Sequence, residues 1–303
     1  MKTVLTGSSG LLGGALVSSF RSDGHEVVRL VRRQPAVPDE ARWDPAAGDV
    51  DPGALRGADL VIHLAGAGIG DRPWTPAQRR AVMDSRVDGT TTIARAVADA
   101  GVPALLSMSG VGYYGNPGDR ARTEADPAGD TYIAEVSRRW EECTAPAAEA
   151  GTRVVTMRTG VVLSAEGGAF GRRLLPLFKL GLGGRLGSGR QWFSWVALPD
   201  YVRAVRFLVD HPELTGPVNI SAPHPLTNAE MTAAMGRVLH RPTVLWAPGF
   251  GLKLVFRDFG EDLLGGQRVV PRRLLDAGFV FAHPEFEPAL RELLAGAHPR
   301  ATS

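Results

Sequence analysis

The chain has 303 residues, a formal net charge of +2 and 44% hydrophobic residues, so it can bury a sizeable core, and its charge does not favour nucleic-acid binding. Its only cysteine, Cys143, excludes an internal disulfide and a multi-cysteine metal site, and we predict no bound metal. No apolar run approaches the ~18 residues of a membrane-spanning helix. With no signal-peptide pattern at the N-terminus, we expect a cytoplasmic protein.

A glycine-rich turn follows the first apolar segment. It reads Thr6-Gly7-Ser8-Ser9-Gly10-Leu11-Leu12-Gly13 and precedes a helix-like stretch near 11–22. Gly7 would permit a tight turn, Gly10 would let the backbone approach a pyrophosphate, and Gly13 would let the helix pack on the strand. This context predicts dinucleotide binding. The alternative is an ordinary glycine-rich turn, because the spacing is GxxGxxG and not GxGxxG.

Short apolar segments alternate with helix-like segments through the first half of the chain. The strand candidates are Lys2–Thr6, Glu26–Val31, Leu60–Leu64, Ala104–Ser109 and Arg153–Arg158, and the helical stretches lie near 11–22, 76–84, 87–100 and 133–150. The alternation predicts an α/β fold with a Rossmann-type, doubly wound parallel sheet.

From about residue 165 the alternation loosens into glycine-rich and proline-rich stretches with shorter elements. We therefore expect a nucleotide-binding domain over 1–165, to which strands and a helix within 190–221 return. Residues 166–303 would form a smaller, mixed C-terminal lobe on the substrate side.

The end of the second strand carries two arginines where an NAD-binding chain usually has an acidic residue. The chain reads Val31-Arg32-Arg33 there. A carboxylate at this place binds the ribose 2′-hydroxyl of NAD, whereas a guanidinium can grip the 2′-phosphate of NADP. The sequence thus favours NADP, and the alternative is that both arginines only solvate a surface turn.

Several further motifs resemble the extended and atypical short-chain dehydrogenase/reductase superfamily. The superfamily motifs are the glycine turn, His63-Leu64-Ala65-Gly66, Ser107-Met108-Ser109-Gly110 and Arg158-Thr159-Gly160-Val161. Within it the chain is similar to the YfcH-type epimerase family proteins that carry a C-terminal DUF1731 segment, here expected within 250–298. The marks of this branch include Gly187-Ser188-Gly189-Arg190 and Gly266-Gln267-Arg268-Val269.

The resemblance implies positions for NADP. The backbone from Ser9 through Gly10 and Leu11 to Leu12 would meet the pyrophosphate, and Val31 and Arg32 would flank the 2′-phosphate. Leu64, Ala65 and Gly66 would line the edge of the next strand, and Val161 would lie near the nicotinamide. Arg86 would reach a phosphate or stabilise the turn. Each apolar residue in this set also has an ordinary core interpretation.

The acid–base pair of the superfamily is incomplete in this chain. Relatives use a tyrosine and, four residues later, a lysine that lowers the tyrosine pKa and holds the nicotinamide ribose. Tyr132 occupies the expected place, but Val136 stands where the lysine belongs, and no YxxxK occurs anywhere. Tyr132 would act as an acid more readily than as a base. Arg139, two helical turns on, is one source of a positive field, and Ser109 is the second candidate catalytic residue.

These observations predict an NADP-dependent oxidoreductase or epimerase that acts on a carbonyl or sugar-like small molecule. The alternative is a non-catalytic NADP-binding redox sensor or regulatory protein. We expect no nucleic-acid or membrane partner. A homodimer would use the helices that carry Arg79, Arg80, Arg138 and Arg139.

Overall fold

The computed structural model describes residues 1–69, 74–248 and 265–296, and its largest element is an eight-stranded sheet. The strand order is β13-β8-β6-β5-β1-β2-β3-β4. The strands are β1 (Lys2–Thr6), β2 (Glu26–Val31), β3 (Glu40–Asp44), β4 (Asp49–Val50), β5 (Leu60–His63), β6 (Ala104–Gly110), β8 (Arg153–Thr159) and β13 (Gly216–Ile220). β1 pairs in parallel with β2 on one side and β5 on the other. The order reverses at β1, which confirms the Rossmann-type α/β class.

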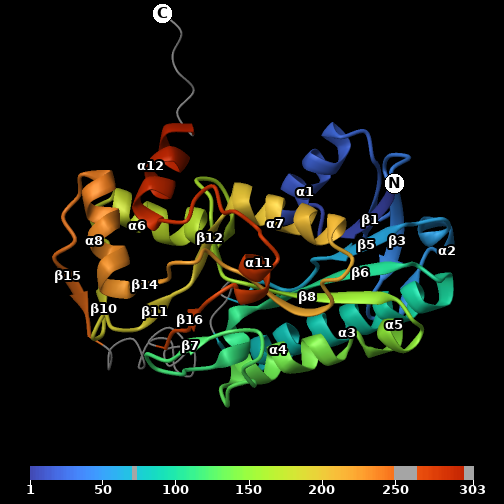
Figure 1. Ribbon diagram of the computed structural model, residues 1–303, viewed down its shortest axis with the longest axis horizontal. Helices are drawn as coiled ribbons and strands as arrows, with labels where there is room; N and C mark the ends of the chain where they lie inside the picture. The colour runs from blue at the N-terminus through green and yellow to red at the C-terminus, as the bar shows by residue number, and fades with distance from the viewer. Residues whose placement is uncertain (70–73, 249–264, 297–303) are drawn as a thin grey trace, which may run out of the picture. The chain divides into compact units, whose positions relative to one another are not determined.

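Helices cover the sheet on both sides (Figure 1). α1 (Leu11–Ser22) lies on one face, and α3 (Pro76–Ala100), α4 (Tyr132–Glu142) and α5 (Ala145–Glu149) lie on the other. Strand residues such as Val4, Val61 and Leu105 pack against Ile93 and Val97 of α3 in one continuous core. Strands buried on both faces explain their nearly unbroken apolar sequences.

Two helix predictions differ from the structure. The stretches 76–84 and 87–100 form one helix, α3, which begins at the Thr75 cap and ends at Gly101 in a left-handed conformation. No proline or glycine pair interrupts it, so nothing in the chain ends it near residue 85. The predicted helix 133–150 is two helices, because Thr144 and Pro146 start a new one. β3 and the short helix α2 (Pro52–Leu55) were not predicted.

The chain folds into two compact units that interleave along the sequence. Unit 1 comprises 1–113, 132–158 and 205–218, and unit 2 comprises 114–131, 159–204 and the described residues from 219 on. α7 (Leu198–Asp210) runs from the second into the first, and β13 then joins the sheet beside β8.

Unit 2 is built from short strand pairs and helices. The pairs are β9 (Val161–Leu163) with β12 (Trp195–Ala197), β10 (Gly184–Leu186) with β15 (Leu245–Ala247), β11 (Trp192–Phe193) with β14 (Leu226–Thr227), and β7 (Ala121–Arg122) with β16 (Arg268–Val269). The α-helices in its described part include α6 (Leu175–Lys179), α8 (Asn228–Leu239), α11 (Arg272–Asp276) and α12 (Phe286–Gly296). Trp195 and Phe286 meet edge to face in its core. Residues 250–264, 297 and 298 of the predicted C-terminal segment lie outside the described residues.

Among the described residues, no helix combines the length and the apolar character that crossing a bilayer requires.

Candidate functional site

The three glycines of the β1–α1 turn are needed for three different reasons. Gly7 has φ +71°, and a Cβ there would come within 2.9 Å of the Leu64 carbonyl carbon at the end of β5. At Gly13 a Cβ would lie 2.2 Å from the Gly7 oxygen, so α1 could not sit so close to the turn. Gly10 is exposed, and a Cβ there would meet only the Gly7 oxygen, at 3.3 Å. Gly10 thus lies exposed at the uncapped start of α1, and a side chain there would make one tight contact with the turn.

A buried hydrogen-bond network joins the ends of β1 and β5. The Thr6 hydroxyl oxygen accepts the backbone N–H groups of Leu64 (3.0 Å) and Ala65 (3.2 Å). Its own proton is therefore directed to Nδ1 of His63 at 2.8 Å, and the His63 proton resides on Nε2. Burial lowers the pKa of His63 to about 3, so the ring is neutral. The edge predicted to line the cofactor is thus held in place by side-chain hydrogen bonds.

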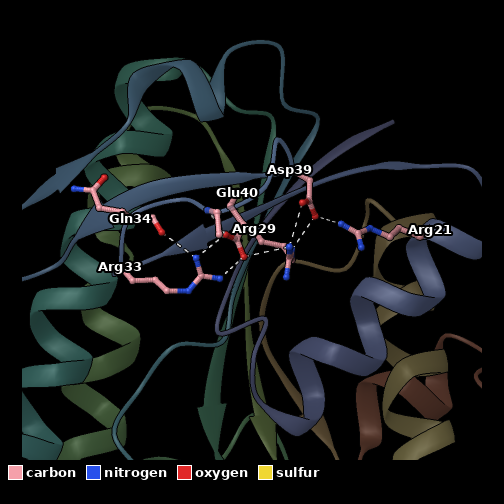
Figure 2. Close-up of polar contacts among 7 residues, drawn as sticks. Arg21, Arg29, Arg33, Gln34, Asp39 and Glu40 are labelled. Carbon is pink, nitrogen blue, oxygen red and sulfur yellow. Dashed lines mark hydrogen bonds and ion pairs between the residues drawn. The ribbon is translucent and has the colours of Figure 1, made fainter.

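A five-residue ion-pair cluster, formed by Arg21, Arg29, Arg33, Asp39 and Glu40, fixes the loop that follows β2 (Figure 2). Arg33 donates to both oxygens of Glu40, at 2.7 and 2.6 Å, and Arg29 donates to Asp39 at 2.8 and 3.1 Å. Glu40 also accepts the backbone N–H of Ala36. The hydrogen bonds from Arg33 hold the pKa of the Glu40 carboxyl below its usual value. Both ends of the loop are therefore tied to the start of β3.

The cluster separates the two arginines that the sequence grouped together. The Arg33 guanidinium is engaged by Glu40. Arg32, one residue earlier, is exposed and has no hydrogen-bond or ion-pair partner in the described part of the chain. Val31, the last residue of β2, is half-buried and pairs with Arg42 on β3. Only Arg32 of the two has an unengaged guanidinium at the end of β2.

Arg86 lies beneath the chain that follows β5. Its Nη1 donates to the carbonyls of Ala67 (3.0 Å) and Val82 (3.1 Å), and its guanidinium packs 4.6 Å from the Trp140 ring. A Cβ on Gly66 would meet this guanidinium at 3.7 Å, an ordinary contact. Arg86 is 5% exposed, so in this arrangement its buried guanidinium supports the backbone that follows β5.

Ser109, near the end of β6, is fully buried and bound to a carboxylate. Its hydroxyl donates to Glu141 Oε1 at 2.7 Å, and Arg158 of β8 donates to both Glu141 oxygens at 2.8 Å. Arg158 also stacks 3.4 Å from the Tyr113 ring centroid. Its side chain is 4% exposed, so the pair is a buried salt bridge. The Ser109 proton is engaged within this network.

Tyr132 begins α4 and is surrounded by groups from α3 and the segment before it. Its hydroxyl donates to the Arg79 carbonyl at 2.8 Å, and the Arg79 guanidinium lies 4.0 Å from its ring centroid. Trp74 meets the ring edge to face. Arg139, the predicted source of positive field, pairs with Glu135 at 2.5 Å and is largely exposed. The cations that contact Tyr132 or its surroundings come from α3.

Glu141 and Arg158 are site-forming residues that the sequence interpretation missed. Arg158 ends a strand expected to be buried, and a buried charge is commonly paired with an opposite charge. That signal was readable, although its partner on α4 was not. Val161, which was predicted to lie near the nicotinamide, is half-buried in β9 of unit 2 and pairs with Trp195. The described residues contain no group of three or more potential His, Cys, Asp or Glu metal ligands.

Comparison with known proteins agrees with this architecture. Residues 3–221 match the NAD dependent epimerase/dehydratase family, and residues 247–293 match a domain of unknown function, DUF1731. The chain belongs to the NAD dependent epimerase/dehydratase family, as the sequence motifs indicated. A nicotinamide dinucleotide is thus the class of cofactor that fits the β1–α1 turn.

Three relatives show how far the likeness extends. The chain is 48% identical over 287 residues to epimerase family protein Mb2239 of Mycobacterium bovis, covering 94% of this chain and 95% of the relative. The crystal structure of human epimerase family protein SDR39U1 (isoform 2) with NADPH has a TM-score of 0.87 and 33% identity, covering 97% and 99% of the two chains. A nucleoside-diphosphate sugar epimerase from Corynebacterium glutamicum has a TM-score of 0.80 and 35% identity. The match covers 97% of this chain and 58% of that longer one.

Proposed function

We propose that this protein is an NADP-dependent oxidoreductase or epimerase that acts on a carbonyl or sugar-like small molecule. The observation that carries the choice of NADP is the unengaged Arg32 guanidinium at the end of β2, next to an Arg33 that Glu40 already holds. A free guanidinium there suits the extra phosphate of NADP through paired, charge-assisted hydrogen bonds. The human relative whose structure contains NADPH supports the same choice.

The described residues fit such a cofactor. The exposed Gly10 and the uncapped start of α1 suit the pyrophosphate, with the backbone of Ser9, Leu11 and Leu12 around it. Arg32 and Val31 would flank the adenosine 2′-phosphate, and the edge formed by Leu64, Ala65 and Gly66 would line the ribose side. The bound nicotinamide supplies or accepts a hydride.

Tyr132 is the better of the two candidate proton donors. The Ser109 proton is held by Glu141, which is itself tied to Arg158, so Ser109 positions that network. The Tyr132 proton is held by one backbone carbonyl, that of Arg79, which a substrate oxygen can replace without breaking a salt bridge. We therefore assign proton donation to Tyr132.

The test compares NADPH and NADH binding in the wild type and in two neighbouring variants. Arg32→Ala is expected to weaken NADPH binding by roughly 30- to 100-fold, the loss of about 2–3 kcal/mol of charge-assisted bonding, with little change for NADH. Arg33→Ala is the matched control, because its side chain is engaged by Glu40. Equal losses for both cofactors with Arg32→Ala would contradict the assignment, as would a larger selective loss with Arg33→Ala.

A non-catalytic NADP sensor is the second candidate. The absent lysine at Val136 favours it, together with the engagement of both the Ser109 and Tyr132 protons within the protein. Oxidation of bound NADPH by any compound in a broad carbonyl panel, abolished in Tyr132→Phe, would establish the enzyme. Tight NADPH binding without turnover would favour the sensor. We also propose that the protein is soluble and cytoplasmic. We propose in addition that it forms a homodimer, which the molar mass from light scattering after size exclusion would check.

A further inference from the structure

Unit 2 contains a cavity of about 370 Å³ that the proposed function does not use. Its walls come from the end of β9 and the residues that follow it, from the end of β12, and from α12. The buried wall is formed by Leu163, Ser164, Ala197 and Ala289, and the exposed rim by Glu166, Pro199, Glu292 and Gly296. A cavity of this volume has the size of a small-molecule site.

The histidine that lines this cavity, His283, is fixed by a fully buried carboxylate. Asp200, in the first turn of α7, accepts the backbone N–H groups of Ala282 (2.9 Å) and His283 (2.7 Å) and a hydrogen bond from Arg203 (2.7 Å). Its Oδ2 also lies 3.3 Å from Nδ1 of the His283 ring. An ionised carboxylate only accepts hydrogen bonds, so the ring proton resides on Nδ1. Asp200 therefore leaves Nε2 as the ring nitrogen that can bind another group.

The second ring nitrogen of His283 faces another acceptor. Its Nε2 lies 3.3 Å from Oε2 of Glu292, a residue of α12 that also lines the cavity. With the proton on Nδ1, a neutral imidazole presents Nε2 as an acceptor, and the carboxylate oxygen is an acceptor as well. Two acceptors at this distance repel each other unless an N–H group donates to both or the ring takes up a second proton. A bound ammonium group would supply such N–H donors.

The charged groups on the cavity wall are acidic. Two carboxylates, Glu166 and Glu292, lie there, and no lysine or arginine is among the described residues that line it. The Ser164 hydroxyl is engaged by the Glu166 carbonyl at 2.5 Å. The rest of the wall is mainly apolar, with leucine, alanine and proline side chains. Such a wall suits a ligand that combines a cationic group with an apolar body.

We propose that this cavity binds a small organic cation, namely a primary ammonium compound with an apolar body. The ammonium group donates to Nε2 of His283 and to Oε2 of Glu292, and Glu166 adds negative charge at the rim. The apolar body packs against the leucine and alanine side chains of the wall. The proposal goes beyond the proposed function and does not depend on it, because no residue assigned to the nicotinamide cofactor or to proton donation lines this cavity.

The test measures the affinity of benzylamine, which is protonated at neutral pH, by a saturation-transfer NMR titration of the full chain without NADPH. Benzyl alcohol is the neutral probe of similar shape, and benzyltrimethylammonium carries the charge without an N–H donor. Benzylamine is expected to bind at least about 10-fold more tightly than benzyl alcohol, because its hydrogen bonds are charge-assisted. Benzyltrimethylammonium should bind more weakly than benzylamine, and equal affinities of these two cations would refute the hydrogen bonds assigned to Nε2 and Glu292.

Two variants locate the binding in this cavity. Glu292→Gln removes the charge of one acceptor and should weaken benzylamine binding on the order of 10-fold, with little change for benzyl alcohol. Ala165→Leu places a larger side chain in the cavity without changing its charge and should weaken the binding of both probes. Circular dichroism checks that each variant is folded.

The matched control is Glu285→Gln. Glu285 also faces a histidine, His224 at 3.6 Å, but it does not line the cavity, so this variant should keep the wild-type affinity for benzylamine. Equal affinities of benzylamine and benzyl alcohol for the wild type would overturn the proposal. An unchanged benzylamine affinity in folded Glu292→Gln would do the same, as would the absence of saturable benzylamine binding below roughly 10 mM.

Discussion

The phosphate turn at residues 7–13 is made of backbone from one continuous stretch of chain, whereas the acid–base end draws side chains from β6, β8, α3 and α4. At the turn each glycine has a steric or conformational reason that its spacing already indicates. At the other end, the partner of Ser109 lies 32 residues away, and that of Tyr132 lies 53 residues away. Local motifs therefore describe the first region well and the second poorly.

The largest loss of NADPH affinity is expected at Gly13, where the turn leaves the least room for a side chain. In Gly13→Ala the new Cβ would lie 2.2 Å from the Gly7 oxygen and 2.8 Å from the Ser8 Cα, and these backbone atoms cannot yield without opening the turn. NADPH affinity should fall on the order of 100-fold, measured by fluorescence titration.

Gly14→Ala is the matched control for this prediction. A Cβ there has only the Ser8 oxygen near it, at 3.8 Å, and alanine favours a helix over glycine. Its NADPH affinity and melting temperature should equal or exceed those of the wild type. Comparable losses in both variants would mean that the space at Gly13 is not what the turn depends on.

The acid–base end is tested by removing the carboxylate that organises it. Glu141→Ala leaves Arg158 buried without a counter-ion and Ser109 without an acceptor. The free energy of unfolding should fall by about 3–5 kcal/mol in urea denaturation. Glu142→Ala, next along the helix, breaks only the exposed pair with Arg138 and should cost less than about 1 kcal/mol. Similar losses of unfolding free energy in the two variants would show that the buried Glu141–Arg158 pair stabilises the fold no more than the exposed pair does.

The sequence predicted the α/β class, the β1–α1 turn and the strands of the sheet core, because each depends on residues close together in the chain. It could not predict that Glu40 binds Arg33 and leaves Arg32 unengaged, because β3 was not recognised as a strand. Likewise, a search for a cation near Tyr132 that follows only α4 reaches Arg139. The cation that lies on the Tyr132 ring is Arg79 of α3, which only the packing of α3 beside α4 reveals.

The stability of the region around the phosphate turn should depend on pH through His63, because the hydrogen bond between His63 and Thr6 holds the end of β5 next to the turn. Burial lowers its folded pKa from 6.5 to about 3. Between these values the unfolded chain binds a proton that the folded chain does not, so stability is complete above pH 6.5 and falls as the pH falls. The loss should approach roughly 3 kcal/mol by pH 4.5.

His63→Asn keeps an acceptor for Thr6 without titrating, so its urea-unfolding free energy should be lower at pH 7.5 but less dependent on pH below 6.5. His25→Gln, in the turn before β2, should keep the wild-type slope. An unchanged slope in His63→Asn would show that the Thr6–His63 bridge is not the acid-sensitive part of the site.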